Sequence, residues 1–401
     1  MTRDEILKRT WAEISLDAIG YNFENVKKAA AGAKVMAIVK ADAYGHGDRM
    51  TAPFLEECGA DWFGVSNLQE ALGIRESGVS KPILILGTTP AECVMDLKTF
   101  GITQALYSLE YAKELSKAAT DAGITIDVHL KFDTGMGRIG FVASDECFEQ
   151  SLEESFEAAN LPGIHVSGAF THFASADELD DSGRNYTLMQ FNRFCRICDA
   201  LKEKGVEISL RHCCNSAATV LNPEMHMDMV RAGIILYGLY PCDDRELKEK
   251  IKLKPAMQLK TVISLVKEYK KGGCVSYGRK FTAPKDMLVA STAIGYADGY
   301  HRVLSGKAPM IVCGQRVNTI GRICMDQTML DVTNVPNVKE GDIVTVFGQD
   351  GDAAVTVDEL ASLADTINYE IVCALSRRVP RRFYLRGENI HNFDYARWME
   401  R

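Results

Sequence analysis

A lysine at the end of a short apolar run is the residue of this chain whose position most clearly indicates chemistry. The run 34–39 predicts a buried strand, and Lys40 follows it directly. An amine at such a place is poorly hydrated, which lowers its pKa below the ordinary value of about 10.4. A lysine of this kind can form a Schiff base with a carbonyl compound. Tyr44 follows within one turn, and Gly45 and Gly47 allow the backbone to loop tightly.

Charged and polar side chains also stand at the ends of later apolar runs. These residues are Lys131, Arg138, His172, His212, Asn215, Ser216 and Arg231, and Gly233 and Ile234 follow the last of them. Each of these residues alone could have a purely structural role. A lysine at a strand end, for example, often only extends its charged end into water. Taken together, a lysine, two arginines, two histidines and a serine predict a pocket for an anionic cofactor, provided that the strand ends share one rim.

The elements that must position these residues alternate between strand and helix. Apolar runs predict eight strands, at 35–41, 62–66, 82–87, 103–107, 126–132, 165–172, 210–215 and 229–237. Amphipathic stretches between them predict helices, for example at 17–31, 68–77, 109–122 and 186–204. This alternation indicates a parallel sheet, and eight such units have the size of a TIM-type (β/α)8 barrel. A doubly wound open sheet is the rival topology.

The pattern changes after residue 243, where strand-like runs replace the helical periodicity. They lie at 257–269, 288–294, 310–312, 328–332 and 342–347, and a capping threonine, Thr356, opens one helix at 356–366. The fold class is therefore α/β, an N-terminal (β/α)8 barrel followed by a mostly β C-terminal domain. We expect an N-terminal segment at 1–10, the barrel at 11–243, the β-rich domain at 244–388 and a surface tail at 389–401.

Composition excludes several classes of partner. A net charge of -8 argues against nucleic acid and anionic membranes as partners. The polar start of the chain resembles no signal segment, and no run of about 18 apolar residues is present. The 12 cysteines are scattered, and Cys195 and Cys198 have no second pair at zinc spacing. We therefore expect a cytoplasmic enzyme with reduced thiols and no metal.

Several separated motifs resemble the alanine racemase family, whose members use pyridoxal 5′-phosphate (PLP). The motifs are Val39–Gly47, Lys131–Gly140, Arg231–Ile234, Val275–Arg279, Gly321–Asp326 and Thr366–Glu370, and the resemblance extends from Trp11 to Arg381. It implies that Lys40 carries PLP as a Schiff base. It also implies that the cofactor is bound by Tyr44, His172, Asn215, Ser216, Arg231, Gly233, Ile234 and Tyr369, with a helix beginning after Arg231 beside the phosphate.

The same resemblance assigns roles around the substrate. Tyr277 would be a second catalytic base, acting on the face of the substrate opposite to Lys40. Arg138, Met325 and Tyr296 would contact or admit the amino acid, and Lys131 would be carbamylated and steady Arg138. His212, Cys324 and Asp326 would not contact the ligands themselves but would hold these residues in position. Because Tyr277 and the Met325 loop serve the partner's site in the family, the resemblance implies a homodimer with shared active sites.

The expected function is interconversion of L- and D-alanine, which supplies D-alanine for peptidoglycan. The nearest alternative is a serine or broad-spectrum amino-acid racemase of the same family, since an apolar pocket rejects one extra hydroxyl only weakly. A PLP-dependent decarboxylase is disfavoured because Arg231 stands where such enzymes place an acidic residue. A non-catalytic PLP-binding protein is disfavoured because it would leave the β-rich domain that carries Tyr277 without a purpose.

Overall fold

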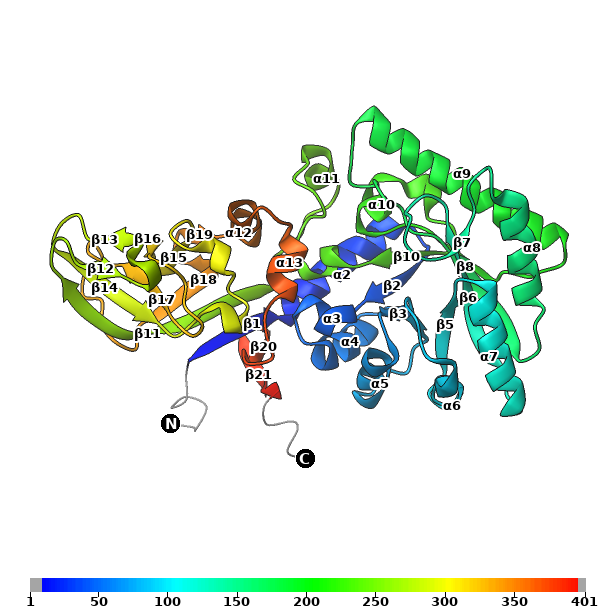
Figure 1. Ribbon diagram of the computed structural model, residues 1–401, viewed down its shortest axis with the longest axis horizontal. Coiled ribbons are helices and arrows are strands. Elements are labelled where there is room, and N and C mark those ends of the chain that lie inside the picture. The colour runs from blue at the N-terminus through cyan, green and yellow to red at the C-terminus, as the bar shows by residue number, and fades with distance from the viewer. Residues whose placement is uncertain (1–8, 396–401) are drawn as a thin grey trace. The chain divides into compact units, whose positions relative to one another are not determined.

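The computed structural model describes residues 9–395, which form two compact units (Figure 1). One unit, the barrel unit, contains residues 18–43 and 48–254. The other, the β unit, contains the described residues up to 17, residues 44–47 and those from 255 onward. The short segment 44–47 thus belongs to the β unit although it lies between two parts of the barrel unit. The domain boundaries expected from the sequence stay a prediction.

The barrel unit is built on parallel strands in the order β10-β2-β3-β4-β5-β6-β8-β9. The bounds are β2 (Lys34–Ile38), β3 (Trp62–Val65), β4 (Ile83–Ile85), β5 (Ile102–Leu106), β6 (Ile126–Asp133), β8 (Ile164–Phe170), β9 (Leu210–His212) and β10 (Met229–Ala232), while β7 (Phe141–Val142) pairs with β6. Each of the eight predicted runs overlaps one of these strands. Backbone hydrogen bonds from Asp228 to Arg211 (3.1 Å) and from Arg231 to Cys214 (3.0 Å) link β9 to β10, so the barrel is nearly closed. The barrel prediction is confirmed and the open sheet is excluded.

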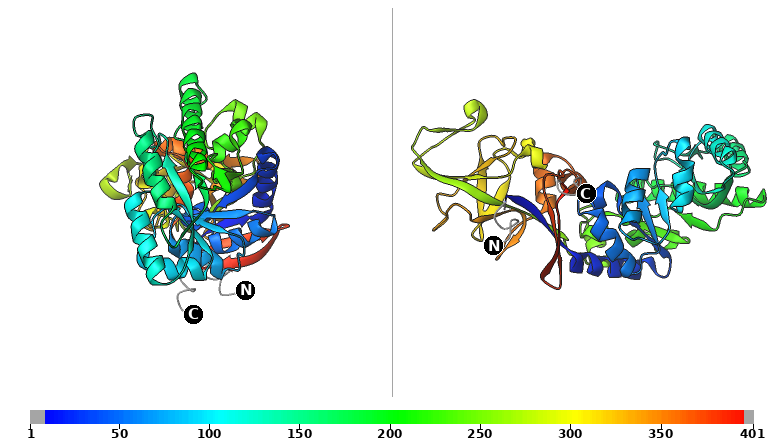
Figure 2. Two further views of the ribbon diagram at one scale, coloured as in Figure 1. Left: turned by 90° about the vertical axis from the view of Figure 1, so that its right-hand side faces the viewer. Right: turned by 90° about the horizontal axis from the view of Figure 1, so that it is seen from below.

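Helices surround these strands (Figure 2, left). They are α2 (Leu16–Ala30), α4 (Asp48–Glu57), α5 (Leu68–Glu76), α6 (Val94–Thr99), α7 (Leu109–Asp121), α8 (Phe148–Ala159), α9 (Asp181–Glu203), α10 (Ser216–Leu221) and α11 (Arg245–Lys250). Asn67, Ser108 and Asp180 cap α5, α7 and α9 by accepting a backbone N–H of the first turn. The amphipathic stretches predicted as helices all lie within this set.

The β unit contains a ten-stranded sheet in the order β19-β18-β15-β16-β17-β14-β11-β1-β20-β21. Its strands are β1 (Thr10–Ser15), β11 (Met257–Tyr269), β14 (Met287–Thr292), β15 (Pro309–Val312), β16 (Gln315–Ile320), β17 (Thr328–Asp331), β18 (Ile343–Asp350), β19 (Ala353–Val355), β20 (Arg381–Leu385) and β21 (Glu388–Phe393). β1 pairs antiparallel with β11 and parallel with β20, so the start of the described chain is part of this sheet. Residues 389–393, expected in a surface tail, form most of β21 and pair with β20.

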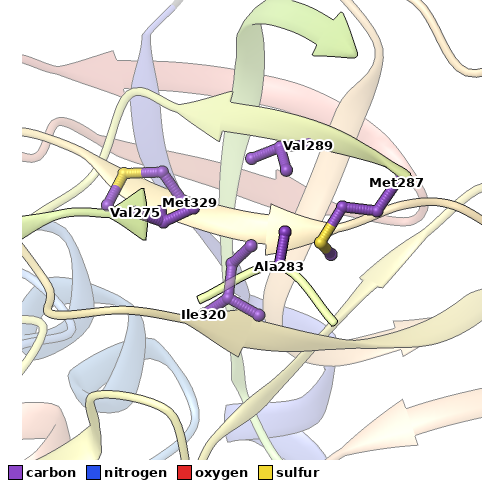
Figure 3. Close-up of a cluster of buried hydrophobic side chains, with 6 residues drawn as sticks. All are labelled: Val275, Ala283, Met287, Val289, Ile320 and Met329. Carbon is purple, nitrogen blue, oxygen red and sulfur yellow. The ribbon is translucent and has the colours of Figure 1, made fainter. Parts of the chain in front are cut away.

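The β unit has its own apolar core, part of which is shown in Figure 3. Side chains from β12 (Cys274–Val275), β14, β16 and β17 meet there with one residue that follows β13 (Phe281–Thr282), namely Val275, Met287, Val289, Ile320, Met329 and Ala283. Two helices, α12 (Val357–Ala364) and α13 (Asn368–Cys373), follow the sheet strands. Thr356 caps α12 by accepting the N–H of Glu359 at 3.0 Å, as its sequence predicted. Among residues 9–395, no helix combines the length and apolar character needed to cross a membrane.

Candidate active site

Lys40 stands two residues beyond the end of β2, and the turn that follows it is left-handed. The four residues Ala41 to Tyr44 all have φ between 53° and 56°, and Ala41 to Ala43 have ψ near 50°, so the turn is a left-handed helix. Such a conformation costs roughly 1–2 kcal/mol per residue for residues with a Cβ atom. The sequence predicted that Tyr44 follows Lys40 by one turn but not that the turn is left-handed. The strain places Lys40 and Tyr44 at the two ends of a very compact segment.

Hydrogen bonds from outside the turn hold it in this conformation. The N–H of Ala41 donates to a carboxylate oxygen of Glu70 at 2.9 Å, and the N–H of Asp48 donates to the Asp42 carboxylate at 3.1 Å. Within the turn, the N–H of Ala43 donates to the carbonyl of Val39 at 2.9 Å. Strained backbone persists where its surroundings over-determine it, and such segments concentrate at functional sites. The position of Lys40 is therefore fixed by the fold and does not depend on a flexible loop.

Arg231, on β10, is the most highly connected side chain at the barrel's carboxyl end. Its Nη1 donates to Nδ1 of His212 (3.0 Å) and to the His212 carbonyl (2.9 Å). Its Nη2 contacts the carbonyls of Thr171 (2.7 Å) and Cys213 (3.0 Å) and Nδ1 of His172 (3.2 Å). The side chain is 4% exposed. The sequence predicted His212 as a supporting residue and His172 as a cofactor contact, and the structure places both imidazoles directly on Arg231.

The electrostatics of this group follow from burial around one cation. Burial lowers the pKa of Arg231 to about 10, a value at which the guanidinium keeps its charge at neutral pH. Burial, followed by the charge of Arg231, lowers the pKa of His172 and of His212 well below the ordinary value. Both imidazoles are therefore neutral. The Nε–H of Arg231 has no acceptor among residues 9–395, so one donor of a buried and rigid guanidinium is left for an acceptor that is not protein.

Predicted phosphate contacts of the barrel unit also lie together. Ser216 begins α10, and its Oγ accepts the N–H of Gly233 at 2.9 Å. Asn215 caps the same helix by accepting the N–H of Ala218 at 3.0 Å. Ile234, which is buried, begins a single 3-10 turn that ends at Tyr237, so the helix expected after Arg231 is only this turn. These compact donors and hydroxyls adjoin the strand that carries Arg231.

Lys131 and Arg138 come from the end of β6 and the loop that follows it. Lys131 is buried, and its Nζ donates to the carbonyl of Phe132 at 2.7 Å. Burial, followed by the charge of Arg231, lowers the pKa of Lys131 to about 7, and Arg138 contributes in the same direction. Arg138 is exposed. The charges of Arg231 and Arg138 thus both disfavour a protonated Lys131, so an anion would be stabilised at this end of the barrel.

Two residues that position this rim were not among the predicted site residues. Asp133 accepts the N–H groups of Gly135 (3.0 Å), Gly137 (3.0 Å) and Arg138 (2.9 Å), and so folds the loop that presents Arg138. Gln190 of α9 contacts the hydroxyl of Thr134 (3.3 Å), the carbonyl of His172 (3.1 Å) and the N–H of Ala174 (2.8 Å). Gln190 therefore ties the loop after β6 to the loop after β8. A motif of glycines around an aspartate is the signal that could have indicated the role of Asp133.

Four of the predicted site residues of the β unit line one groove of about 510 Å³. Tyr277, Cys324, Met325 and Asp326 line it, together with Ser276 and Gln327. Tyr277 is 67% exposed and Met325 52% exposed, which is unusual for large apolar or aromatic side chains. Ser276 has a φ of 65° and donates its hydroxyl to the carbonyl of Arg322 at 2.6 Å, so it joins the Tyr277 turn to the Met325 loop.

An ion pair between the partly exposed Arg9 and the buried Asp298 anchors the segment that carries Tyr296. The carboxylate of Asp298 receives both terminal nitrogens of Arg9 at 2.7 Å and the N–H of Gly295 at 2.9 Å. The N–H of Tyr296 donates to the carbonyl of Cys324 at 3.0 Å, which joins this segment to the groove. Tyr296 itself is 42% exposed. Its predicted place at the entry to a site is thus compatible with its surroundings.

Tyr44 and Tyr369, the two tyrosines predicted to contact phosphate, lie near each other in the β unit. Their ring centroids are 6.0 Å apart. Tyr369 belongs to α13, and Gly45 approaches the same helix so closely that a Cβ there would be 2.1 Å from the carbonyl oxygen of Val372. Burial, followed by the nearby Cys373, raises the pKa of the Tyr44 hydroxyl above its ordinary value. A phenol that keeps its proton is a hydrogen-bond donor, as a phosphate ligand must be.

Comparison with known proteins identifies this combination of units. The family models for the alanine racemase N-terminal domain and C-terminal domain match residues 14–241 and 256–383. The chain belongs to the alanine racemase family. An alanine racemase of Clostridium tetani is 43% identical over 96% of this chain and 97% of its own length. The solved alanine racemase of Clostridium difficile 630 has a TM-score of 0.90 at 40% identity and covers 96% of this chain and 98% of its own.

A third comparison bears on the ligand. The alanine racemase of Bacillus anthracis, solved with bound L-Ala-P, has a TM-score of 0.88 at 35% identity and covers 97% of this chain and 98% of its own. The family consists of PLP-dependent racemases that interconvert L- and D-alanine. The residues of this chain fit PLP: a lysine fixed at a strand end, a buried guanidinium with a donor left over, and phenol and hydroxyl donors for a phosphate.

Proposed function

We propose that this chain interconverts L- and D-alanine, with PLP bound to Lys40 and with Lys40 and Tyr277 as the two groups that exchange the α-proton. The observation that carries the proposal is the buried Arg231, whose two terminal nitrogens are saturated by five contacts while its Nε–H has no acceptor among residues 9–395. This donor is suited to the ring nitrogen of PLP. Because an arginine at neutral pH does not release its proton, that nitrogen would stay an unprotonated acceptor.

Other residues of the chain would bind the cofactor phosphate and the substrate carboxylate. Bound PLP would supply a conjugated ring that withdraws electrons and so acidifies the α-proton of the amino acid. Tyr44, Tyr369, Ser216 and the Gly233 and Ile234 amides would bind the phosphate, with Asn215 fixing the helix beside it. Arg138 and the Met325 amide would hold the substrate carboxylate, and Tyr296 would narrow the entry. Cys324 and Asp326 would shape the loop that carries Met325.

Racemisation requires proton transfer on both faces of the α-carbon. Lys40 would hold or accept the proton on one face, and the Tyr277 oxygen on the other. Tyr277 is strongly exposed in its own unit, and a side chain with a catalytic role needs surroundings that this exposure does not provide. We infer that a second copy of the chain supplies them, which makes the protein a homodimer with shared sites. The exposed Met325 in the same groove supports this inference.

Lys131 is proposed to be carbamylated. Its pKa of about 7 leaves a large share of the amine neutral, and a neutral amine can add to carbon dioxide, releasing a proton and forming a carbamate. The resulting anion would replace a buried cation beside Arg231 and Arg138. With ¹³C-labelled carbon dioxide, the wild-type protein should show a carbamate carbon signal that the Lys131→Gln variant lacks. A wild-type spectrum without that signal would overturn the assignment.

We propose that the protein acts in the cytoplasm, where it supplies D-alanine for the synthesis of peptidoglycan. Alanine is the substrate named for the relatives described above, and none of them favours the serine or broad-spectrum alternative. Each of the twelve cysteines is a free thiol, which agrees with a reducing compartment.

A chiral assay tests the proposal directly. The purified protein would be incubated with L-alanine, L-serine and L-lysine, with and without added PLP, and the enantiomers would be separated. We expect a racemic end point with alanine, dependence on PLP, slower conversion of serine and no conversion of lysine. Failure to convert alanine with PLP bound would exclude the proposed function, and faster conversion of serine would favour the alternative substrate.

A further inference from the structure

We propose that His129, on β6, is a positioning residue for Arg231, acting through His212. In this view His129 accepts the N–H of His212 and thereby holds the His212 ring, in the tautomer that Arg231 requires, against Arg231. The inference deepens the proposed function and rests on it, because Arg231 is there assigned to the ring nitrogen of PLP. His129 was not among the predicted site residues, since a histidine inside an apolar run resembles any other strand residue.

Arg231 determines the direction of the hydrogen bonds that link it to His212 and His212 to His129. An arginine has only donors, so Nδ1 of His212, 3.0 Å from Nη1 of Arg231, must be an acceptor without a hydrogen. The single hydrogen of neutral His212 is therefore on Nε2. That atom lies 2.9 Å from Nδ1 of His129, which must in turn be an acceptor. The hydrogen of His129 is then on its own Nε2, for which the described part of the chain offers no hydrogen-bond partner.

Burial keeps both imidazoles neutral, as this arrangement requires. His129 and His212 are fully buried. Burial, followed by the charge of Arg231, lowers the pKa of His129 to about 3, and His212 is shifted in the same direction. With one hydrogen on each ring, Arg231 donates to His212 and His212 donates to His129. No proton in the series is available for transfer toward Arg231.

The backbone makes specific room for His129. Between Val128 and His129 the register of β6 with β8 shifts by one residue, so that His129 lies opposite Gly168. A Cβ at Gly168 would come within 2.6 Å of Nε2 of His129. A bulge of this kind re-aims a side chain, and such bulges are frequent near active sites. A conventional strand pair with a larger residue at position 168 could not contain this imidazole.

Aromatic contacts restrain the two rings as well. The His212 ring is stacked on Phe170 with a centroid distance of 5.1 Å and an interplanar angle of 2°. The His129 ring lies 5.2 Å from the ring of Trp62 on β3. Neither imidazole can therefore turn freely, and the tautomers alone decide which hydrogen bonds form. In the opposite tautomer, His212 would direct an N–H at the N–H of Arg231, and the contact between them would be lost.

The experiment compares two substitutions of His129 in the PLP-bound protein labelled with ¹⁵N-histidine. His129→Asn keeps an acceptor close to the position of Nδ1, whereas His129→Leu removes it. His226→Leu is the control, because His226 is another buried histidine of the barrel unit whose contacts are the carbonyls of Ala30 and Thr219. Nitrogen–proton correlation spectra report the tautomer of each ring, and alanine racemisation reports kcat and KM.

We expect wild-type His212 and His129 to be neutral with hydrogen on Nε2. His129→Leu should leave the Nε2–H of His212 without its acceptor, shift the signal of that group, and lower kcat about tenfold, equivalent to about 1.4 kcal/mol, with KM changed much less. His129→Asn should recover most of the rate and the signal. The control should leave the His212 tautomer unaltered.

Three results would overturn the inference: hydrogen on Nδ1 of wild-type His212, an unchanged His212 signal and kcat in His129→Leu, or equal losses in both His129 variants. If His129→Leu does not fold, the wild-type tautomers and His129→Asn still decide. A wild-type protein that shows the expected tautomers but does not racemise alanine would contradict the proposed function alone.

Discussion

Two aspartates of the barrel unit show how immediate surroundings set the behaviour of a carboxyl group. Asp133 accepts three backbone N–H groups, which together hold its pKa below the ordinary value despite partial burial. Asp48 is half-buried beside Asp42, and the loss of solvent followed by that negative neighbour raises its pKa to about 7. The first aspartate is therefore a fixed anion that shapes a loop. The second exchanges its proton near neutral pH, directly after the turn that follows Lys40.

Replacing Asp133 should damage both stability and activity. An asparagine offers one acceptor oxygen, so at least one of the three N–H groups loses its partner, at a cost of about 1–3 kcal/mol. The loop that presents Arg138 would loosen, and we expect kcat/KM for alanine to fall about tenfold. Urea unfolding and steady-state kinetics measure the two effects. Asp145→Asn, which removes an exposed partner of Arg193, is the matched control and should cost less than 1 kcal/mol.

The raised pKa of Asp48 predicts a specific dependence of stability on pH. Because the folded state binds this proton more tightly than the unfolded state, the stability it contributes is fully present below about pH 4 and is lost as the pH rises through 7. Asp48→Asn should therefore be more stable than the wild type at pH 8 and lose that advantage at pH 5. Asp181→Asn, at an exposed first turn of α9, should show no such crossover. Parallel unfolding curves for Asp48→Asn and the wild type across this range would contradict the prediction.

At the scale of elements, the left-handed turn after β2 is the most distinctive feature. It is formed by alanine, aspartate, alanine and tyrosine, none of which has glycine's freedom at positive φ. The cost is offset by the hydrogen bonds to Glu70 and from Asp48, so the turn depends on α5 and α4 for its shape. Residues of two later helices thus fix the backbone from which the Lys40 side chain extends.

A glycine in this turn should stabilise the protein, contrary to its usual effect in a helix. Ala41 is exposed, so Ala41→Gly removes no packing. It relieves roughly 1–2 kcal/mol of left-handed strain and costs about 0.5–1 kcal/mol of backbone entropy. We expect a net gain of about 0.5–1 kcal/mol in the free energy of unfolding. The same change at Ala118 of the right-handed helix α7 should cost about 1 kcal/mol. Equal losses at both positions would show that the turn is not strained.

The sequence predicted those elements whose signal is local. All eight barrel strands and the longest β-unit strand, β11, were predicted because continuous apolar runs mark buried strands. β1 was not predicted as a strand, because its partners β11 and β20 lie more than 200 residues away and its pattern carries no trace of them. The left-handed turn was not predicted because no single residue in it favours positive φ.

The same distinction holds for the candidate site. Arg231, His212 and His172 were predicted from their places at strand ends, where the barrel brings them together. His129 and Gln190 were not, because one lies within a strand and the other on a helix face, and their roles arise only from contacts across the barrel. The relation of Lys40 to Tyr277 stays a prediction.

At the scale of the whole molecule, the predicted catalytic pair is divided between the two units. Lys40 and the cationic rim belong to the barrel unit, whereas Tyr277 and the groove with Met325 belong to the β unit. If the two sites of a dimer are shared, each is assembled from the Lys40 of one copy and the Tyr277 of the other. Symmetric dimers with an interface of this kind contain two identical sites.

Mixing two inactive variants distinguishes shared sites from sites within one chain. Lys40→Ala and Tyr277→Phe should each lose nearly all racemase activity. In a mixed dimer, one site combines both substitutions, while the other pairs an intact Lys40 with an intact Tyr277. Equal amounts, exchanged to equilibrium, give about half mixed dimers and hence about a quarter of wild-type activity.

The control is the double variant carrying both substitutions in one chain, mixed with wild type. If the sites are shared, every mixed dimer in this control has one substituted residue in each of its two sites, so both sites are inactive. Only the wild-type dimers remain active, and the activity falls to about a quarter. Sites confined to one chain would instead leave half of the activity in this control and none in the first mixture. Sedimentation of the separate variants confirms that each still associates, so that a loss of activity reports the composition of the sites and not the loss of the dimer.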